Sequence, residues 1–238
     1  MKPFEKTCSS QSHIRSFVHC RSRMSPNRRC AFKKYWPQYG LSVMQGMVNF
    51  TELFQRTAPV VLEIGFGRGD ALLQMAKEHP EKNYLGIEVH PLGVAALLQR
   101  IAQEGLSNIR IYQEDAVLVL DQCIRGISLS VIYLFFPDPW PKRRHHKRRL
   151  IQAAFIDLVY RKLVSGGSLH MATDWWPYAE QAMKVISQHT GFDNPIGERA
   201  FFKNQSVRVP TRFEHRARRL GHDVWDLLFV KNTNQTEP

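Results

Sequence analysis

From about Pro59 onward the chain alternates short apolar runs with segments in which apolar residues recur at helical spacing. Strands are predicted at residues 60–64, 83–89, 109–113, 129–136 and 168–172, where β-branched or continuous apolar residues end at glycine, proline or polar residues. Helices are predicted at 70–78, 92–104, 150–163 and 177–189, with a turn at Gly166-Gly167. Repeated β-α units of this length predict a parallel sheet with helices on both faces, and ligands at the carboxyl ends of its strands.

The composition, with 43% hydrophobic and 23% charged residues among 238, is that of a folded protein. The longest apolar run, Val131 to Phe136, is far shorter than the roughly 20 residues of a membrane-spanning helix. The first residues do not resemble a secretory signal, so we expect a cytoplasmic protein. The four cysteines, at positions 8, 20, 30 and 123, form no metal-binding spacing, and we expect reduced thiols and no metal.

The net charge of +12 is concentrated in three segments. Residues 1–50 contain nine Lys and Arg but one acid, residues 142–149 contain six Lys and Arg and no acid, and the tail from residue 199 is also basic. The stretch between the first two segments is net acidic. Such focused positive charge favours a polyanionic partner, above all a nucleic acid. We expect residues 1–40 to form a basic, partly disordered arm and residues 41–238 to form a single domain.

A glycine-rich loop, Gly65-Phe66-Gly67-Arg68-Gly69, follows the first predicted strand and precedes a helix. Such a loop lets a ligand approach the backbone closely. Its spacing fits neither the dinucleotide fingerprint nor a Walker phosphate loop. Glu63, at the end of the preceding apolar strand, is costly to bury unless it meets a positive group. The ammonium of S-adenosyl-methionine is such a group.

Two further acids follow the next two predicted strands. Glu88 stands where nucleotide-binding β-α-β units place an acid on the ribose hydroxyls, and Asp115 is positioned to accept a hydrogen bond from an adenine amino group. Each acid alone is also explained as a surface group, and Asp115 as the cap of a following helix. Together with Glu63 they favour a site for S-adenosyl-methionine over another nucleotide cofactor.

Three prolines stiffen the loop Pro137-Asp138-Pro139-Trp140-Pro141 after the fourth predicted strand. Stiffness holds Asp138 and Trp140 in a set geometry, as an active site requires, although an ordinary turn is the alternative. The basic run 142–149 follows at once and is suited to contact phosphates, while a purely solvated charge run is its competing interpretation. We interpret His145-His146 as part of this surface and not as a metal site.

These residues resemble a known family, the bacterial tRNA (guanine-N7)-methyltransferases. The matching segments run in order through most of the chain: Ile14-Arg15-Ser16-Phe17, Leu62-Glu63-Ile64-Gly65-Phe66-Gly67, Gly86-Ile87-Glu88-Val89-His90, Glu114-Asp115-Ala116, Phe136-Pro137-Asp138-Pro139-Trp140 with Lys142 and Arg148-Arg149, Ala172-Thr173-Asp174-Trp175, and Thr211-Arg212-Phe213-Glu214. Trp176 and Arg212 stand where members of the family vary.

The resemblance implies a class I methyltransferase (Rossmann-like) fold with a seven-stranded, mostly parallel sheet whose last strands include residues 223–230. It implies methylation of N7 of guanosine 46 in the tRNA variable loop with S-adenosyl-methionine as donor. It also implies roles for particular residues. The cofactor would be bound by Glu63, Gly65, Gly67, Glu88, Asp115 and Asp138, with Asp138 also catalytic; the substrate by Lys142, Asp174, Thr211, Arg212, Phe213 and Glu214; and the RNA by Arg144, His145, His146, Lys147, Arg148 and Arg149.

Two other functions stay open on the sequence. Asp138-Pro139-Trp140 loosely resembles the Asp-Pro-Pro-aromatic loop of exocyclic-amine methyltransferases, although the second proline is missing. A non-enzymatic RNA-binding protein with a vestigial cofactor fold is the other alternative, against which the intact acids argue. The sequence does not decide the oligomeric state; we expect a monomer and leave a dimer open.

Overall fold

The computed structural model describes residues 16–17, 24–202 and 209–233, and in this part of the chain eight strands form one sheet. Its order is β1-β4-β3-β2-β5-β6-β8-β7, with β1 (Gly40–Leu41), β2 (Val60–Ile64), β3 (Asn83–Ile87), β4 (Ile109–Tyr112), β5 (Leu129–Phe135), β6 (Leu163–Thr173), β7 (Phe192–Asp193) and β8 (Trp225–Lys231). Neighbours from β1 to β6 are parallel, while β8 is antiparallel to β6 and β7. The sheet has one strand more than the expected seven, and both of its edge strands, β1 and β7, are only two residues long.

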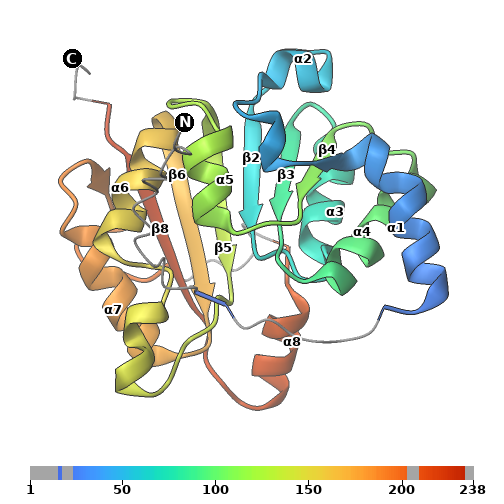
Figure 1. The fold of residues 1–238 in the computed structure, drawn as a ribbon. Helices are drawn as coiled ribbons and strands as arrows, with labels where there is room; N and C mark the ends of the chain where they lie inside the picture. Colours follow the sequence, from blue (N-terminus) through green and yellow to red (C-terminus); the bar gives the residue numbers. More distant parts are fainter. Residues whose placement is uncertain (1–15, 18–23, 203–208, 234–238) are drawn as a thin grey trace, which may run out of the picture.

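Helices cover both faces of the sheet, as the sequence predicted (Figure 1). One face carries α1 (Pro26–Tyr39), α3 (Asp70–Glu78) and α4 (Pro91–Glu104), and the other carries α5 (Ala116–Cys123), α6 (Ala153–Lys162) and α7 (Trp176–Ser187). Neighbouring side chains of a strand point to opposite faces, so that Val61 packs in the α3–α4 core and Leu62 in the α5–α7 core. Shorter elements are η1 (Val43–Gln45), α2 (Phe50–Phe54), η2 (Arg143–Arg148) and α8 (Arg212–Arg219).

Within the segment 1–40, for which we expect a basic, partly disordered arm, residues 26–39 form the helix α1. Ser25 caps this helix by accepting a hydrogen bond from the Arg28 amide, and proline opens its first turn. Phe32 and Trp36 stack with ring centroids 4.8 Å apart and pack on the α3–α4 core. The four-residue spacing of these rings forms an apolar stripe among the basic residues. The rest of the arm lies outside the described residues, apart from 16–17 and 24–25.

The predicted turn at Gly166-Gly167 is also wrong, because β6 continues through both glycines. The register against β5 moves from Leu129 opposite Leu163 to Val131 opposite Ser168, so the extra residues of β6 form a bulge. Gly166 has φ +72°, a left-handed conformation that glycine adopts at little cost. A bulge thus absorbs the glycine pair without ending the strand.

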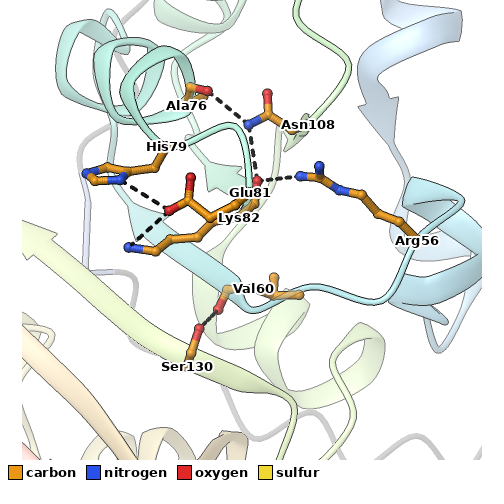
Figure 2. A network of polar contacts seen from close by, with 8 residues as sticks. All are labelled: Arg56, Val60, Ala76, His79, Glu81, Lys82, Asn108 and Ser130. Atoms are coloured by element: carbon orange, nitrogen blue, oxygen red, sulfur yellow. Dashed lines mark hydrogen bonds and ion pairs between the residues drawn. The ribbon is translucent and has the colours of Figure 1, made fainter.

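Polar contacts join the loops at the amino ends of the central strands (Figure 2). Arg56 Nη2 donates to the Lys82 carbonyl at 2.7 Å, and Asn108 Nδ2 donates to the same carbonyl at 3.1 Å. Ser130 Oγ donates to the Val60 carbonyl at 2.8 Å. These bonds fix the starts of β2 to β5, whereas their carboxyl ends point toward the end of the sheet where α8 lies (Figure 1).

Candidate active site

Two adjoining cavities lie at the carboxyl ends of β2, β3 and β5, with volumes of about 630 and 220 Å³. Both are lined by the glycine loop, by the residues that follow β3, and by Phe213 of α8. The larger cavity also contains Glu63 and the smaller one Asp138. The fold therefore brings together residues from three strand ends and from a helix far away in the sequence.

Glu63 is the most unusual group of the larger cavity. Its side chain is only 3% exposed, and its Oε2 has no hydrogen-bond partner among the described residues. Burial, together with the nearby Glu88 and Asp70 carboxylates, raises the pKa of Glu63 to about 8, and burial is the largest of these causes. A buried acceptor without a donor is costly, so this cavity suits a ligand that brings a cationic donor such as an ammonium group.

Glu88 occupies the same cavity with a different hydrogen-bonding environment. Its Oε2 accepts from the Gly67 amide and its Oε1 from the His90 amide, both at 2.8 Å. Burial is the main cause of its raised pKa, while these two backbone donors act in the opposite direction. The carboxylate is therefore held in place and ties the end of β3 to the glycine loop.

The glycine loop also depends on a glycine outside it, Gly93, which was not among the predicted site residues. Gly65 and Gly67 have φ +72° and +58°, which disfavours any residue with a side chain. Gly93, in the first turn of α4, lies so close to the loop that a Cβ there would be 2.0 Å from the Gly67 carbonyl oxygen. The sequence signal that could have indicated this contact is a glycine within a predicted helix.

Asp115 caps α5, as the alternative interpretation proposed. Its Oδ1 accepts from the Val117 amide at 2.8 Å, and it lines a third cavity of about 840 Å³ beside the other two. The neighbouring Glu114 lines both this cavity and the 220 Å³ cavity, and it was not among the predicted site residues. A cofactor contact of Asp115 stays a prediction.

The proline loop holds Asp138 at the mouth of the smaller cavity. Phe136 and Trp140 flank it with φ +51° and +43°, a conformation that is costly for bulky residues and that concentrates at functional sites. The protein atoms around Asp138 raise the pKa of its carboxyl by desolvation, and the charges of His90 and Arg148 oppose this rise. Phe136 also stacks on Phe213 across the cavity, with ring centroids 6.2 Å apart.

The basic run does not present all its side chains to solvent. Lys142, Arg144 and Lys147 are exposed, as is Arg143, whereas the two histidines and Arg148 are half-buried. The Arg148 guanidinium lies 3.9 Å from the centroid of the Trp140 ring. The run forms the 3₁₀ helix η2, in which successive side chains point in different directions around the axis.

Arg149 departs from the expectation that the whole run is an RNA-facing surface, because its side chain is only 3% exposed. Its guanidinium instead donates to the carbonyls of Pro139 and Pro177 and to the side chain of Gln181. Desolvation lowers the pKa of this guanidinium. The last cation of the run is thus an interior group.

The other predicted substrate residues lie at the same end of the sheet but in different environments. Asp174 follows β6, with its Oδ2 3.9 Å from His222 Nδ1. Thr211 accepts the Glu214 amide as the cap of α8, and it lines the larger cavity together with Arg212 and Phe213. The Glu214 side chain is buried and paired with Arg218. Lining residues that the sequence did not indicate are His90, His215, Arg216 and Arg219.

Among the described residues, no group of three or more His, Cys, Asp or Glu side chains is arranged to hold a metal ion. Within the same residues, no helix is both long and apolar enough to cross a membrane.

Comparisons with known proteins agree with this geometry. Residues 57–227 match a family model described as "Putative methyltransferase". The chain is 52% identical over 218 residues to a tRNA (guanine-N(7)-)-methyltransferase of Alcanivorax borkumensis, which covers 92% of this chain and 91% of that protein. It is 47% identical over 228 residues to the enzyme of the same name from Escherichia coli, covering 96% and 95%.

Solved structures show a likeness of fold. A 16S rRNA methyltransferase, KamB, superposes with a TM-score of 0.56 at 15% identity and covers 77% of this chain and 92% of that chain. An S-adenosyl-methionine-dependent O-methyltransferase of Thermotoga maritima superposes with a TM-score of 0.50 at 15% identity, covering 79% and 64%. At these identities the likeness concerns the fold alone.

Proposed function

Because the chain belongs to the tRNA (guanine-N7)-methyltransferase family, we propose that it methylates N7 of guanosine 46 in the tRNA variable loop with S-adenosyl-methionine as methyl donor. Its fold is the class I methyltransferase fold, whose ligands bind at the carboxyl ends of the strands. The residues described below support the choice of donor and of tRNA as substrate.

The unpartnered Glu63 carboxylate carries the proposal of the donor. The ammonium of S-adenosyl-methionine is a cationic donor of the kind that this buried Oε2 lacks among the described residues. Glu88, fixed by two backbone amides, would bind the ribose hydroxyls, and the left-handed Gly65 and Gly67 would let the backbone approach the ligand. When bound, S-adenosyl-methionine supplies an electrophilic methyl group on a sulfonium.

The chemistry requires alignment more than proton transfer. Guanine N7 has an in-plane lone pair and no proton, so no general base is needed to create the nucleophile. Holding the reacting atoms in line and near contact contributes roughly 7–11 kcal/mol in favourable cases. As positive charge moves onto the guanine ring, the Asp138 carboxylate stabilises it, and Asp174 accepts from the guanine N1–H and amino group.

The exposed cations of the basic run support the choice of tRNA as substrate. Lys142, Arg144 and Lys147 are exposed on η2 and its N-cap, immediately after the loop that holds Asp138. Cations in this position neutralise backbone phosphates while the target base enters the cavities. Phe213, exposed on α8 and part of both cavities, offers an aromatic face to that base.

Identification of the methylated nucleoside tests the proposal. The purified protein is incubated with methyl-labelled S-adenosyl-methionine and an unmodified tRNA transcript, and the product is digested to nucleosides. We expect N7-methylguanosine, with chain cleavage at position 46 after borohydride and aniline treatment. The matched control is a transcript with adenosine at position 46, which should not be methylated. A product methylated on an exocyclic amine, or transfer to the control transcript, contradicts the proposal.

A further inference from the structure

Arg149 is a buried cation whose hydrogen bonds join two loops of the candidate active site. Its Nε donates to the Pro139 carbonyl at 2.8 Å, and its Nη1 donates to the Pro177 carbonyl at 3.2 Å. Pro139 follows Asp138 directly, and Pro177 lies three residues after Asp174. The guanidinium therefore bridges the loop after β5, which holds one proposed active-site carboxylate, and the segment after β6, which holds the other.

From this geometry we propose that Arg149 is a positioning residue for methyl transfer, which sets the placement of the Asp138 loop relative to the Asp174 segment. The inference rests on the proposed function for the roles of the two carboxylates. It departs from the interpretation of Arg149 as an RNA contact, which its burial does not favour.

The surroundings of the guanidinium form a closed network. Gln181 Oε1 accepts from Arg149 Nη1 at 3.3 Å, while Gln181 Nε2 donates to the Ile151 carbonyl at 2.7 Å. The Ile151 amide donates to the Tyr178 hydroxyl at 3.2 Å, and the guanidinium lies 5.0 Å from the centroid of the Tyr178 ring. Arg149 Nη2 also lies 3.2 Å from His146 Nε2. The first two turns of α7 thus provide two of the acceptors of Arg149, Pro177 and Gln181.

Only an arginine meets these acceptors together. The guanidinium is a planar fork whose Nε and Nη donors point in different directions, so that Pro139 and Pro177 are reached from one rigid group. A lysine ammonium on a flexible stem cannot hold both carbonyls with the same geometry. Burying a cation among carbonyl and amide oxygens is costly, which argues that this position is not a generic member of a basic surface.

The basic run itself provides a matched control. Lys147 is two residues away, carries the same charge and is exposed, so its loss should weaken binding to the tRNA phosphates. Arg149→Lys keeps the charge at position 149 but loses the fork. Gln181→Ala changes no charge and removes one acceptor of the guanidinium. If Arg149 is a positioning residue, Arg149→Lys and Gln181→Ala should lower kcat more than they weaken tRNA binding. If Arg149 is an RNA contact, its loss should weaken tRNA binding as the loss of Lys147 does.

The test measures kcat at saturating donor and tRNA, together with the dissociation constants for tRNA and for S-adenosyl-methionine. Because a misplacement of about 1 Å can cost 100-fold in rate, we expect Arg149→Lys to lower kcat by about tenfold or more, and Gln181→Ala by a smaller factor. Both variants should keep the dissociation constant for tRNA within about twofold of that of the unsubstituted protein, whereas Lys147→Ala should raise it. If Arg149→Lys keeps full kcat, or if Arg149→Ala weakens tRNA binding as Lys147→Ala does with kcat retained, the positioning role is wrong.

Hydrogen exchange provides a readout that does not depend on activity. We expect Arg149→Lys and Gln181→Ala to accelerate amide exchange in peptides that cover residues 135–150 and 174–181, and Lys147→Ala to leave them unchanged. Exchange identical to that of the unsubstituted protein in both variants contradicts the proposal. Failure of the unsubstituted protein to form N7-methylguanosine would instead contradict the proposed function, and the exchange comparison would still decide the role of Arg149.

Discussion

Glu63 and Glu88 line one cavity from neighbouring strands, but Glu88 accepts two backbone hydrogen bonds while Glu63 Oε2 accepts none from the described residues. Both carboxyl groups are buried, and the charge of Glu88 contributes to the raised pKa of Glu63. Glu88 is therefore held in place by the protein, whereas Glu63 is available to bind a cationic group of a ligand.

The first prediction concerns proton release when S-adenosyl-methionine binds. In the folded protein without ligand, Glu63 has a pKa of about 8 and is largely protonated at pH 7. A bound cationic ligand lowers that pKa. We expect release of up to about one proton per donor bound at pH 7, falling toward zero above pH 9. Calorimetry in buffers of different ionisation enthalpy measures this number. Glu63→Gln should abolish the buffer dependence; an unchanged dependence would assign the proton to another group.

A second prediction concerns the stability of the protein without its cofactor. Folding raises the pKa of Glu63 from 4.5 to about 8. The contribution of this group to the free energy of unfolding is therefore fully present below pH 4.5 and is lost as the pH rises toward 8. This group should lower the free energy of unfolding by up to about 4 kcal/mol over that interval. Denaturant titrations at pH 5 and pH 8 should show a smaller loss for Glu63→Gln than for the unsubstituted protein. An equal loss would contradict the assignment.

The third prediction concerns the contact between Gly93 and the glycine loop. In Gly93→Ala the new Cβ would lie 2.0 Å from the Gly67 carbonyl oxygen, so the loop must move and disturb its bond to Glu88. We expect the dissociation constant for S-adenosyl-methionine to rise by about tenfold or more, which corresponds to a loss of about 1.4 kcal/mol of binding free energy. Gly126→Ala is the control, because its Cβ would meet its nearest neighbour at 3.4 Å. Equal affinities of the two variants would rule out the contact as the cause.

A fourth prediction separates exposed cations from cofactor binding. Arg144→Gln and Lys147→Gln each remove an exposed charge of the basic run. Each should weaken tRNA binding and reduce the slope of log K against log salt by about 1, while leaving the affinity for S-adenosyl-methionine unchanged. Filter binding over a series of salt concentrations measures the slope. If these variants weaken binding of S-adenosyl-methionine as much as binding of tRNA, the charges of Arg144 and Lys147 do not act on tRNA alone.

The fifth prediction concerns Asp138 and pH. Desolvation raises the pKa of this carboxyl, and its ionised form is the one that stabilises positive charge on the guanine. The rate of methyl transfer should therefore fall as the pH drops through that raised pKa. Asp138→Asn should lower kcat above that pKa, where the unsubstituted carboxyl is ionised, and remove this acidic limb, while tRNA affinity is retained. Full activity of Asp138→Asn at saturating donor and tRNA would refute the catalytic assignment.

The central strands and the strand-end acids were predictable from local pattern. The apolar runs that form β2, β3, β4 and β5 end at glycine or polar residues, and their observed bounds differ from the predicted ones by at most two residues. The parallel topology then places Glu63, Glu88 and Asp115 at one edge without further information. Helix α1 was not predicted, because its apolar stripe is sparse and is stable only against α4.

The sequence by itself determined the fold class, the family and the residue types of the site, because hydrophobic periodicity and motif spacing are properties of the chain. Only the tertiary structure decided which residues of the same type are exposed and which are buried at the site. Lys147 and Arg149 belong to one basic run, but one is exposed and the other donates hydrogen bonds to two active-site loops. Burial and hydrogen-bond partners depend on packing between distant segments, and no local pattern encodes which cation of a run will point inward.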